Sequence, residues 1–400
     1  MDDETRVRKK LEHDKKRMFW LLLIFGGRQE TKFYHCLTEE GRRRRQRCLP
    51  RPALCLPSES PWARLCESGL DQALITAADC DFAAFWKMLA LFKPWFDTHT
   101  PWVGKQDGAN FAKLNPFKRG GGRPRSVDAK SCLGLVLAWC RFRGPEFILQ
   151  GWFGFVGSHA NVWLRFGRRG LIKLLWTDAA AGVRMPAPNK IEELKEATLQ
   201  RHSLLDDVFC MADGLKLMFE QHADLDEQSM HHNGWTSGHH IANLFCFSVD
   251  GQIILATVNA PRSIHDSMLA HWGGLCATLE KVYEETGGKC CVDSAFATLN
   301  AECMIKSAQN PTGNEDTVGI CCLAQATSLR QAAEWGMRAI QLSFPRLKDK
   351  INIKHNGERR VFLHLMPLLC NFGLEHVGLN QIRNTHCLQW SVDAKHFVHR

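Results

Sequence analysis

The sequence lacks the features that mark zinc-ribbon and disulfide-bonded proteins. Its 17 cysteines include no C-x-x-C pair, and Cys290-Cys291 and Cys321-Cys322 are adjacent residues in apolar runs. Neighbouring residues of a strand face opposite sides of the sheet and do not form a tetrahedral clamp. The odd count, together with the lack of a secretory signal, predicts reduced thiols inside a cell and no structural zinc.

The sequence also lacks an apolar run long enough to cross a bilayer. Residues 18–25 are apolar, but this run is about half of the ~20 residues that a membrane helix needs. Mostly charged residues precede it, and no small-residue cleavage site follows. We therefore expect a buried helix turn or strand here, and a soluble protein with no membrane partner.

Acidic charge does not balance basic charge at the start of the chain. Residues 1–51 carry fifteen Lys/Arg against eight Asp/Glu, so most of the net charge of +9 lies there. A basic end on a nearly neutral body suits an anionic polymer or an address signal better than a small acidic substrate. The 400 residues, 45% of them hydrophobic, predict two or three compact units with a sizeable core.

Two basic segments are candidates for nucleic-acid contact. Residues 1–60 form an irregular arm whose arginine run fits a nuclear localisation signal or a phosphate-binding arm; a solvated charge run explains it equally well. A glycine-rich connector at residues 118–125 suits a phosphate backbone, and a plain linker explains it nearly as well. The predicted contacts are Arg42, Arg43, Arg44, Arg45 and Arg47 in the arm, and Lys118, Arg119, Arg123 and Arg125 in the connector.

Residues 61–176 are predicted to be helical. A helix over residues 79–96 has Asp79 or Asp81 as its cap, an aromatic stripe for the core, and Pro94 to end it. Residues 126–175 predict three helices, with Ser126 or Asp128 starting the first and Ser158 capping the last.

The glycine-containing turn between the last two of these helices fits a helix-turn-helix. Its final helix carries polar and basic groups that suit phosphates or base edges. An ordinary helical hairpin with a basic outer face is the alternative. The predicted contacts are His159, Asn161, Arg165, Arg168 and Arg169.

Residues 204–385 have the pattern of an α/β domain, preceded by a helix over residues 190–200. Three strands are predicted at residues 208–217, 241–248 and 253–258, then a helix over 266–285, a strand at 289–292, a fifth strand at 318–323 and a helix over 328–348. The helix over 266–285 is expected to bury Leu269, Trp272, Leu279 and Val282. The order βββαβαβα is that of the ribonuclease H-like fold, a mixed sheet with flanking helices.

Three carboxylates are expected to meet at one edge of this sheet. Asp213 lies inside the first strand, where an acid is costly unless it is hydrated, paired or bound to a metal. Asp293 follows the fourth strand, and Glu334 lies on the flank of the last helix beside Arg338, a further candidate DNA contact. Alone, Asp293 fits a helix cap and Glu334 a surface charge.

Together these acids need cations, and oxygen ligands suit Mg²⁺ or Mn²⁺. Two such ions, bridged by Asp213 and completed by Asp293 and Glu334, activate an attacking water or 3′-hydroxyl and stabilise the leaving oxygen.

A series of short motifs stands in a specific order and spacing along the second half of the chain. They are Asp213-Gly214, Gly234-Trp235, Gly238-His239-His240, Asp250-Gly251, His265-Asp266-Ser267, Val292-Asp293-Ser294-Ala295-Phe296, Arg330-x-x-x-Glu334-x-Gly336, and Asn371 with Gly378-x-Asn380-Gln381-Ile382. Through these motifs, about residues 123–385 resemble the PIF/Harbinger-type DDE transposases of the DDE superfamily endonuclease group. Three departures are Leu215-Lys216 after Asp213-Gly214, Arg262 in a turn where glycine is usual, and a long interval between Asp293 and Glu334.

The resemblance implies a nuclear transposase, or a nuclease derived from one, that cuts and joins double-stranded DNA at transposon ends. It implies a catalytic triad of Asp213, Asp293 and Glu334 with two divalent ions, and Asp266 as an additional or alternative metal ligand, although helix capping also explains that residue. A Myb-like DNA-binding partner and a homo-oligomer are the partners implied. The alternatives are a catalytically inactive DNA-binding derivative and a ribonuclease H-like RNA nuclease.

Overall fold

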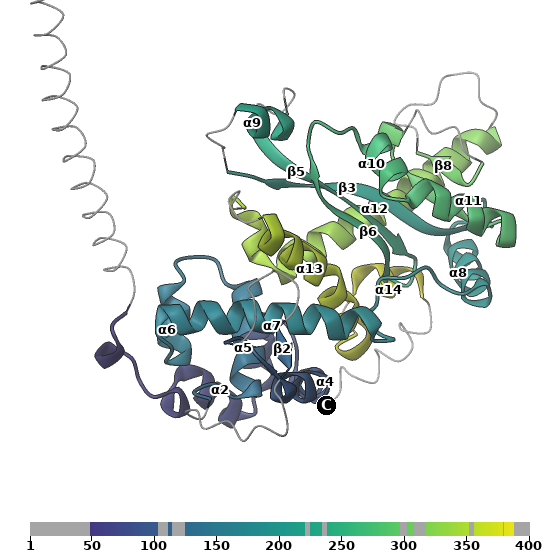
Figure 1. Cartoon of the computed structure of the whole chain (residues 1–400). Helices are drawn as coiled ribbons and strands as arrows, with labels where there is room; N and C mark the ends of the chain where they lie inside the picture. The colour runs from purple at the N-terminus through teal and green to yellow at the C-terminus, as the bar shows by residue number, and fades with distance from the viewer. Residues whose placement is uncertain are drawn as a thin grey trace, which may run out of the picture.

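The computed structural model describes residues 49–102, 111–113, 125–220, 225–233, 238–296, 302–307, 317–351, 356–378 and 380–387. Figure 1 shows a helical part, drawn in purple and blue, packed beside a mixed sheet with helices around it. The arginine run at residues 42–47, most of the basic connector and the loop at residues 311–314 lie outside the described residues. None of the helices in the described ranges has the length and apolar character needed to cross a membrane.

The helical part contains the segments expected between residues 61 and 176. Its elements are η1 (Arg51–Ala53), η2 (Pro57–Glu59), α2 (Pro61–Ser68), α3 (Asp71–Ala78), α4 (Phe82–Thr98), α5 (Ala129–Arg141), α6 (Phe147–Phe153) and α7 (Gly157–Thr177), with a two-stranded pair β1 (His99–Thr100) and β2 (Ala112–Lys113).

Helix α4 begins as expected but ends later than expected. The Asp81 carboxylate accepts a hydrogen bond from the backbone N–H of Ala84 at 2.7 Å, which caps the helix. Pro94 does not end α4, which continues to Thr98. Phe92 and Phe96 on either side of the proline are both buried, so packing compensates for the lost backbone hydrogen bond.

Helices α5 and α7 form the centre of this part. Asp128 caps α5 by accepting from the N–H of Ser131 at 2.7 Å. The prediction that Ser158 caps α7 was wrong, because α7 begins at Gly157 and follows Val156, whose side chain makes no capping bond.

The sheet holds the strands β4 (His232–Asn233), β5 (Gly238–Ser248), β3 (Val208–Met218), β7 (Lys289–Val292) and β8 (Met304–Lys306) in that order, with β6 (Ile253–Pro261) paired to β5. β3 pairs with β5 antiparallel and with β7 parallel. β5 pairs antiparallel with β6, and β7 parallel with β8. The mixed α/β architecture is compatible with the expected fold.

Helices lie on both faces of the sheet (Figure 1). They are α8 (Pro188–Arg201), α9 (Leu225–His231), α10 (Asp266–Trp272), α11 (Leu275–Thr286), η3 (Ser294–Phe296), α12 (Thr317–Ser343), η4 (Pro345–Lys348), α13 (Asn356–His376) and α14 (Gln381–His386). Gly336 of α12 packs on Phe247, whereas Asp266 of α10 packs on Gly214 from the opposite face. Asn371 of α13 hydrogen-bonds both the N–H and the C=O of Ile253, at 2.8 and 2.9 Å, and so satisfies the outer edge of β6.

The fifth strand was predicted in the wrong place. Residues 318–323 belong to the first turns of α12, and the strand beside β7 is β8 at residues 304–306. Val318 and Ile320 are 62% and 43% exposed, so this apolar run is not part of a core. A short apolar run does not distinguish a strand from a helix by periodicity alone.

The helix expected over residues 266–285 is two helices, α10 and α11. Gly273 and Gly274 separate them, and Gly274 has φ 78°, which a helix does not allow. Leu269, Leu279 and Val282 are buried as expected. Trp272 was expected to be buried and is 67% exposed, because the chain turns directly after it.

Candidate active site: carboxylates at the end of the central strands

Asp213 and Asp293 are placed side by side by the register of two parallel strands. Ala212 of β3 pairs with Val292 of β7, so the next residue on each strand is an aspartate. Met211 and Cys291 form the pair before them, and the Cys291 thiol donates to the C=O of Ala326 in α12. Because side chains alternate along a strand, Asp213 points to the same face as Met211, the face that α12 covers.

Asp213 is largely enclosed by the protein. Its side chain is 20% exposed, and its Oδ1 accepts from the N–H of Gly214 at 2.7 Å. Burial, helped by the neighbouring charges of Asp293 and Glu334, raises the pKa of Asp213 to about 6, although the Gly214 N–H and Arg330 oppose the shift. A carboxylate with this pKa is poised to gain or lose a proton near neutrality.

Glu334 is linked to Asp213 by Arg330, an arginine to which the sequence patterns assigned no role. Arg330 Nη1 lies 2.9 Å from Glu334 Oε1 and 3.7 Å from Asp213 Oδ2. Arg330 and Glu334 are four residues apart on α12, so they share one side of the helix. Arg330 stood in the family motif without an assigned role, and its spacing to Glu334 was the signal available.

The three acids converge without forming one tight cluster. Among the described residues, the ligand atoms of these three acids do not all lie within 4.8 Å of one another. Glu334 is 55% exposed and reaches the group through Arg330. Oxygen donors held around a raised-pKa aspartate, with an arginine supplying the positive charge, are a donor set that fits Mg²⁺ or Mn²⁺.

Asp266 lies apart from this group. Its carboxylate carbon would be 3.3 Å from a Cβ built on Gly214, which places it on the opposite face of β3 from Asp213. Its Oδ1 pairs with Arg262 Nη1 at 3.1 Å. His265, rather than Asp266, caps α10. Asp266 therefore packs against β3 on the face opposite to Asp213. In this position it would not bind the same metal ion as Asp213.

The α7 arginines that were predicted to contact DNA form ion pairs within the protein. Arg165, Arg168 and Arg169 all pair with Glu358 of α13, at 3.1, 2.9 and 2.6 Å. The side chains of Arg168 and Arg169 are only 7% and 13% exposed, so their guanidinium groups join α7 to α13. The prediction of DNA contact by these two is thus corrected, because periodicity alone did not reveal a partner on another helix.

The remaining predicted contacts have different surroundings. Arg125 donates to the C=O of Phe96 and of His99 and lies over the Phe96 ring at 4.7 Å, so it closes the end of α4. Asn161, Arg165 and Arg338 are exposed. The ring centroids of His159 and Trp102 lie 5.7 Å apart. Arg42, Arg43, Arg44, Arg45, Arg47, Lys118, Arg119 and Arg123 lie outside the described residues.

A cluster of three buried cysteines lies on the other face of the same strands. The sulfur atoms of Cys210, Cys246 and Cys290 are all within 4.8 Å of one another, and their residues have no exposed surface. They come from β3, β5 and β7, at intervals of sequence that match no metal motif. No fourth metal-binding side chain joins the group in the part of the chain that the structure describes.

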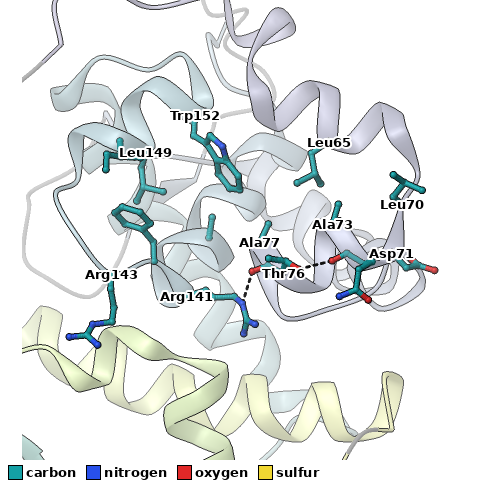
Figure 2. A pocket seen from close by; sticks show the side chains of 14 residues that line it. Leu65, Leu70, Asp71, Ala73, Thr76, Ala77, Arg141, Arg143, Leu149 and Trp152 are labelled. Atoms are coloured by element: carbon teal, nitrogen blue, oxygen red, sulfur yellow. Dashed lines mark hydrogen bonds between the residues drawn. The ribbon is translucent and has the colours of Figure 1, made fainter.

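The helical part contains an apolar cavity of about 800 Å³, remote from the carboxylates. Figure 2 shows Leu65, Leu149 and Trp152 around it, with the Arg141 guanidinium donating to the C=O of Thr76. It has no cluster of titratable groups and lies between α2, α3, α5 and α6. It does not contribute to the carboxylate site.

The part of the chain that carries the carboxylates is similar to a known family. Residues 212–371 match the family model described as DDE superfamily endonuclease. The matched range includes Asp213, Asp293 and Glu334, and it ends at Asn371, the residue that binds the edge of β6. Searches of curated proteins and of solved structures found no match.

The resemblance seen in the sequence is therefore confirmed at the level of the DDE superfamily endonucleases. The family suggests a nuclease that acts on DNA. The match is to the superfamily as a whole.

Proposed function

We propose that the chain is a divalent-metal-dependent DNA endonuclease of the PIF/Harbinger type, which cuts and joins strands at transposon ends. The observation that carries the proposal is the register of β3 and β7, which brings Asp213 next to Asp293 on the face where Glu334 lies. It is supported by the family match over the same residues.

In this proposal Asp213, Asp293 and Glu334 hold two Mg²⁺ or Mn²⁺ ions. The ions supply Lewis acidity to a phosphodiester and lower the pKa of a bound water or 3′-hydroxyl. Asp213, which is largely enclosed, would hold the ions together with Asp293 and Glu334. Arg330 holds Glu334 in place and offsets the repulsion between the acids. Phe247 and Gly336 keep α12 close enough to the sheet for Glu334 to reach.

The DNA is expected to lie across exposed basic and polar groups. Asn161, Arg165 and Arg338 are exposed, and they are proposed to contact phosphates. Helices α6 and α7 are proposed to act as a helix-turn-helix. The basic residues at 42–47 and 118–123 are proposed as a nuclear signal and as further phosphate contacts, and a Myb-like partner and a homo-oligomer as the assembly.

The test is metal-dependent nicking of supercoiled plasmid, followed by cleavage of duplex DNA and of RNA in parallel. Wild-type protein is expected to nick DNA with Mg²⁺ or Mn²⁺ and not with EDTA. Asp213→Ala is expected to abolish nicking, whereas Asp206→Ala, an exposed acid before the same strand, is expected to leave it unchanged. Nicking that survives Asp213→Ala or EDTA contradicts the proposal, and cleavage of RNA alone changes the substrate.

A DNA-binding protein without catalysis is the second candidate. The observation in its favour is Glu334, whose side chain is 55% exposed and pairs with Arg330. In that case DNA binding is salt-sensitive and unaffected by Asp213→Ala, and no cleavage occurs with any divalent metal.

A further inference from the structure

A second cavity, of about 530 Å³, lies between α7, η4 and α13, away from the carboxylates. Five basic side chains line it: Arg165, Arg168, Arg346, Lys350 and Arg359. Three acidic side chains also line it, so positive charge is in excess. Of the lining residues, the nuclease function proposed above uses only the exposed Asn161 and Arg165, and it assigns no role to Arg168, Arg346 and Lys350.

Each of the acidic groups already has a partner. Glu358 accepts from the α7 arginines, and Asp349 pairs with Arg143 at 2.8 Å. Glu146 accepts from the indole N–H of Trp139 at 3.1 Å. Arg346 and Lys350 have no ion-pair partner within the described ranges, so the excess charge concentrates on one side of the cavity.

Two of the arginines each lie against the ring of Trp139. The guanidinium carbons of Arg168 and Arg346 lie 4.4 and 4.0 Å from the centroid of Trp139. Arg346 Nε also donates to the C=O of Trp139 at 2.8 Å, which fixes its position. Burial lowers the pKa of both arginines, since it disfavours the charged form. Glu358 compensates the charge of Arg168, whereas Arg346 has no ion-pair partner among the described residues.

Both arginines have buried N–H groups without an acceptor. These are Nε of Arg168 and Nη2 of Arg346, among the residues that the structure describes. Arg168 is 6% exposed, so solvent does not reach most of its guanidinium. A buried donor without a partner costs about 1–3 kcal/mol, and more when it is charged, so the two guanidinium groups are not fully compensated within the protein.

We propose that this cavity binds a phosphate group carried by a ligand of nucleotide size. The tetrahedral oxyanion accepts from Arg168, Arg346 and Lys350, as guanidinium and ammonium groups require. Trp139, Leu164 and Phe362 provide apolar contact for the rest of the ligand. The volume suits one nucleotide rather than a duplex. The phosphate comes either from a free nucleotide or from a strand end of bound DNA.

The first measurement is binding to the full chain in EDTA, by calorimetry and by thermal melting at constant ionic strength. The probes are inorganic phosphate, deoxyadenosine monophosphate and unphosphorylated deoxyadenosine. The phosphate and the nucleotide are expected to bind saturably and to raise the melting temperature. Deoxyadenosine is expected to bind at least tenfold more weakly than the nucleotide.

Variants locate the site. Lys350→Gln changes an exposed lining residue and leaves the buried pair intact, and Arg346→Gln removes one cation of that pair. Each is expected to weaken phosphate binding about tenfold, the loss of one charge-assisted hydrogen bond. Arg360→Gln is the matched control, an exposed arginine of α13 outside the lining, and is expected to bind as wild type does.

Competition binding experiments distinguish the two sources of the phosphate. Displacement of the nucleotide by a 5′-phosphorylated duplex, and not by the same duplex without the phosphate, assigns the site to a DNA end. Lack of displacement by either duplex assigns it to a free nucleotide. Non-saturable binding, or equal affinity in wild type, Lys350→Gln and Arg346→Gln, overturns the proposal. Asp213→Asn protein is expected to bind the nucleotide unchanged, so this outcome is independent of whether the nuclease proposal holds.

Discussion

Ala212 and Val292 are paired in register between parallel strands β3 and β7, so Asp213 inside β3 and Asp293 directly after β7 lie side by side. The relationship depends on backbone pairing and not on a contact between the two carboxylates. The site is consequently built into the centre of the sheet, where the strands are buried on both faces. Of the three acids, only Glu334 lies on a helix, so its position depends on how α12 packs against the sheet.

The first prediction concerns the cost of burying Asp213. Its pKa is about 6 in the folded protein, above the ordinary value of 3.8. Between these values the folded state holds a proton that the unfolded state has lost, so stability falls as the pH rises through this window. Asp213→Asn in EDTA is expected to raise the free energy of unfolding by about 2 kcal/mol at pH 7.5 and to have little effect at pH 4. Urea denaturation at both pH values measures this.

The control for this prediction is Asp97→Asn, an exposed acid of α4 that pairs with Lys93. It is expected to change stability by no more than about 0.5 kcal/mol at either pH. Adding Mg²⁺ is expected to stabilise wild type and not Asp213→Asn. A variant that is less stable than wild type at pH 7.5 in EDTA contradicts the account of Asp213.

The second prediction concerns Arg330, which pairs with Glu334 at 2.9 Å and lies 3.7 Å from Asp213. Arg330→Gln removes the positive charge among the acids. In EDTA it is expected to lower the free energy of unfolding by up to about 1 kcal/mol. Because the guanidinium also repels cations, Mg²⁺ is expected to raise the melting temperature of the variant more than that of wild type.

Melting curves with EDTA and with increasing Mg²⁺ measure both effects. Arg338→Gln, an exposed arginine two turns further along α12, is the matched control and is expected to respond to Mg²⁺ as wild type does. An equal Mg²⁺ response in all three proteins shows that Arg330 is not close to the ions.

The strands could be predicted from the sequence because alternating and apolar runs determine them locally. β3 and β7 were located to within one residue, so Asp213 was correctly placed inside one strand and Asp293 directly after the other. The fifth strand could not be located, because the short segment Met304–Lys306 has little pattern, and the stronger apolar run at residues 318–323 is helical.

The roles of the α7 arginines could not be predicted for a different reason. Helical periodicity gave them a basic face, but their partner Glu358 lies some 190 residues further along the chain. The same applies to the Cys210, Cys246 and Cys290 cluster, which only strand pairing brings together. Local patterns do not carry such contacts between distant segments.

The third prediction concerns Glu358. Burial alone would raise the pKa of Glu358, but Arg168, Arg169 and Arg165 outweigh it and hold the pKa below its ordinary 4.5. Its contribution to stability is therefore complete above that value and is lost as the pH falls through the lowered pKa. Glu358→Gln leaves buried arginines without a counter-charge and is expected to cost about 2–3 kcal/mol at pH 7.

Urea denaturation from pH 7 down to pH 3 measures this effect, which is expected to shrink at the acid end. The matched control is Glu284→Gln, an exposed acid of α11, with an expected change of no more than about 0.5 kcal/mol. If the two variants are equally stable at pH 7, Glu358 does not hold α7 and α13 together.

The fourth prediction tests the packing that delivers Glu334. A Cβ on Gly336 would lie 2.7 Å from Cε1 of Phe247, in the ring that separates α12 from the sheet. Gly336→Ala is expected to cost about 1–3 kcal/mol, because the helix or the ring must shift. Gly373→Ala, in α13, has open space around the added methyl group and is expected to gain up to about 1 kcal/mol from helix propensity.

The consequence for the site is larger than the loss of stability. Glu334 precedes Gly336 by two residues, so a displaced α12 carries this carboxylate away from Asp213 and Asp293. Nicking by Gly336→Ala, measured at a temperature where the protein is fully folded, is expected to fall at least tenfold, while Gly373→Ala keeps wild-type activity. Full activity in a folded Gly336→Ala protein means that the position of Glu334 tolerates movement of α12, and that the site depends on the two strand aspartates alone.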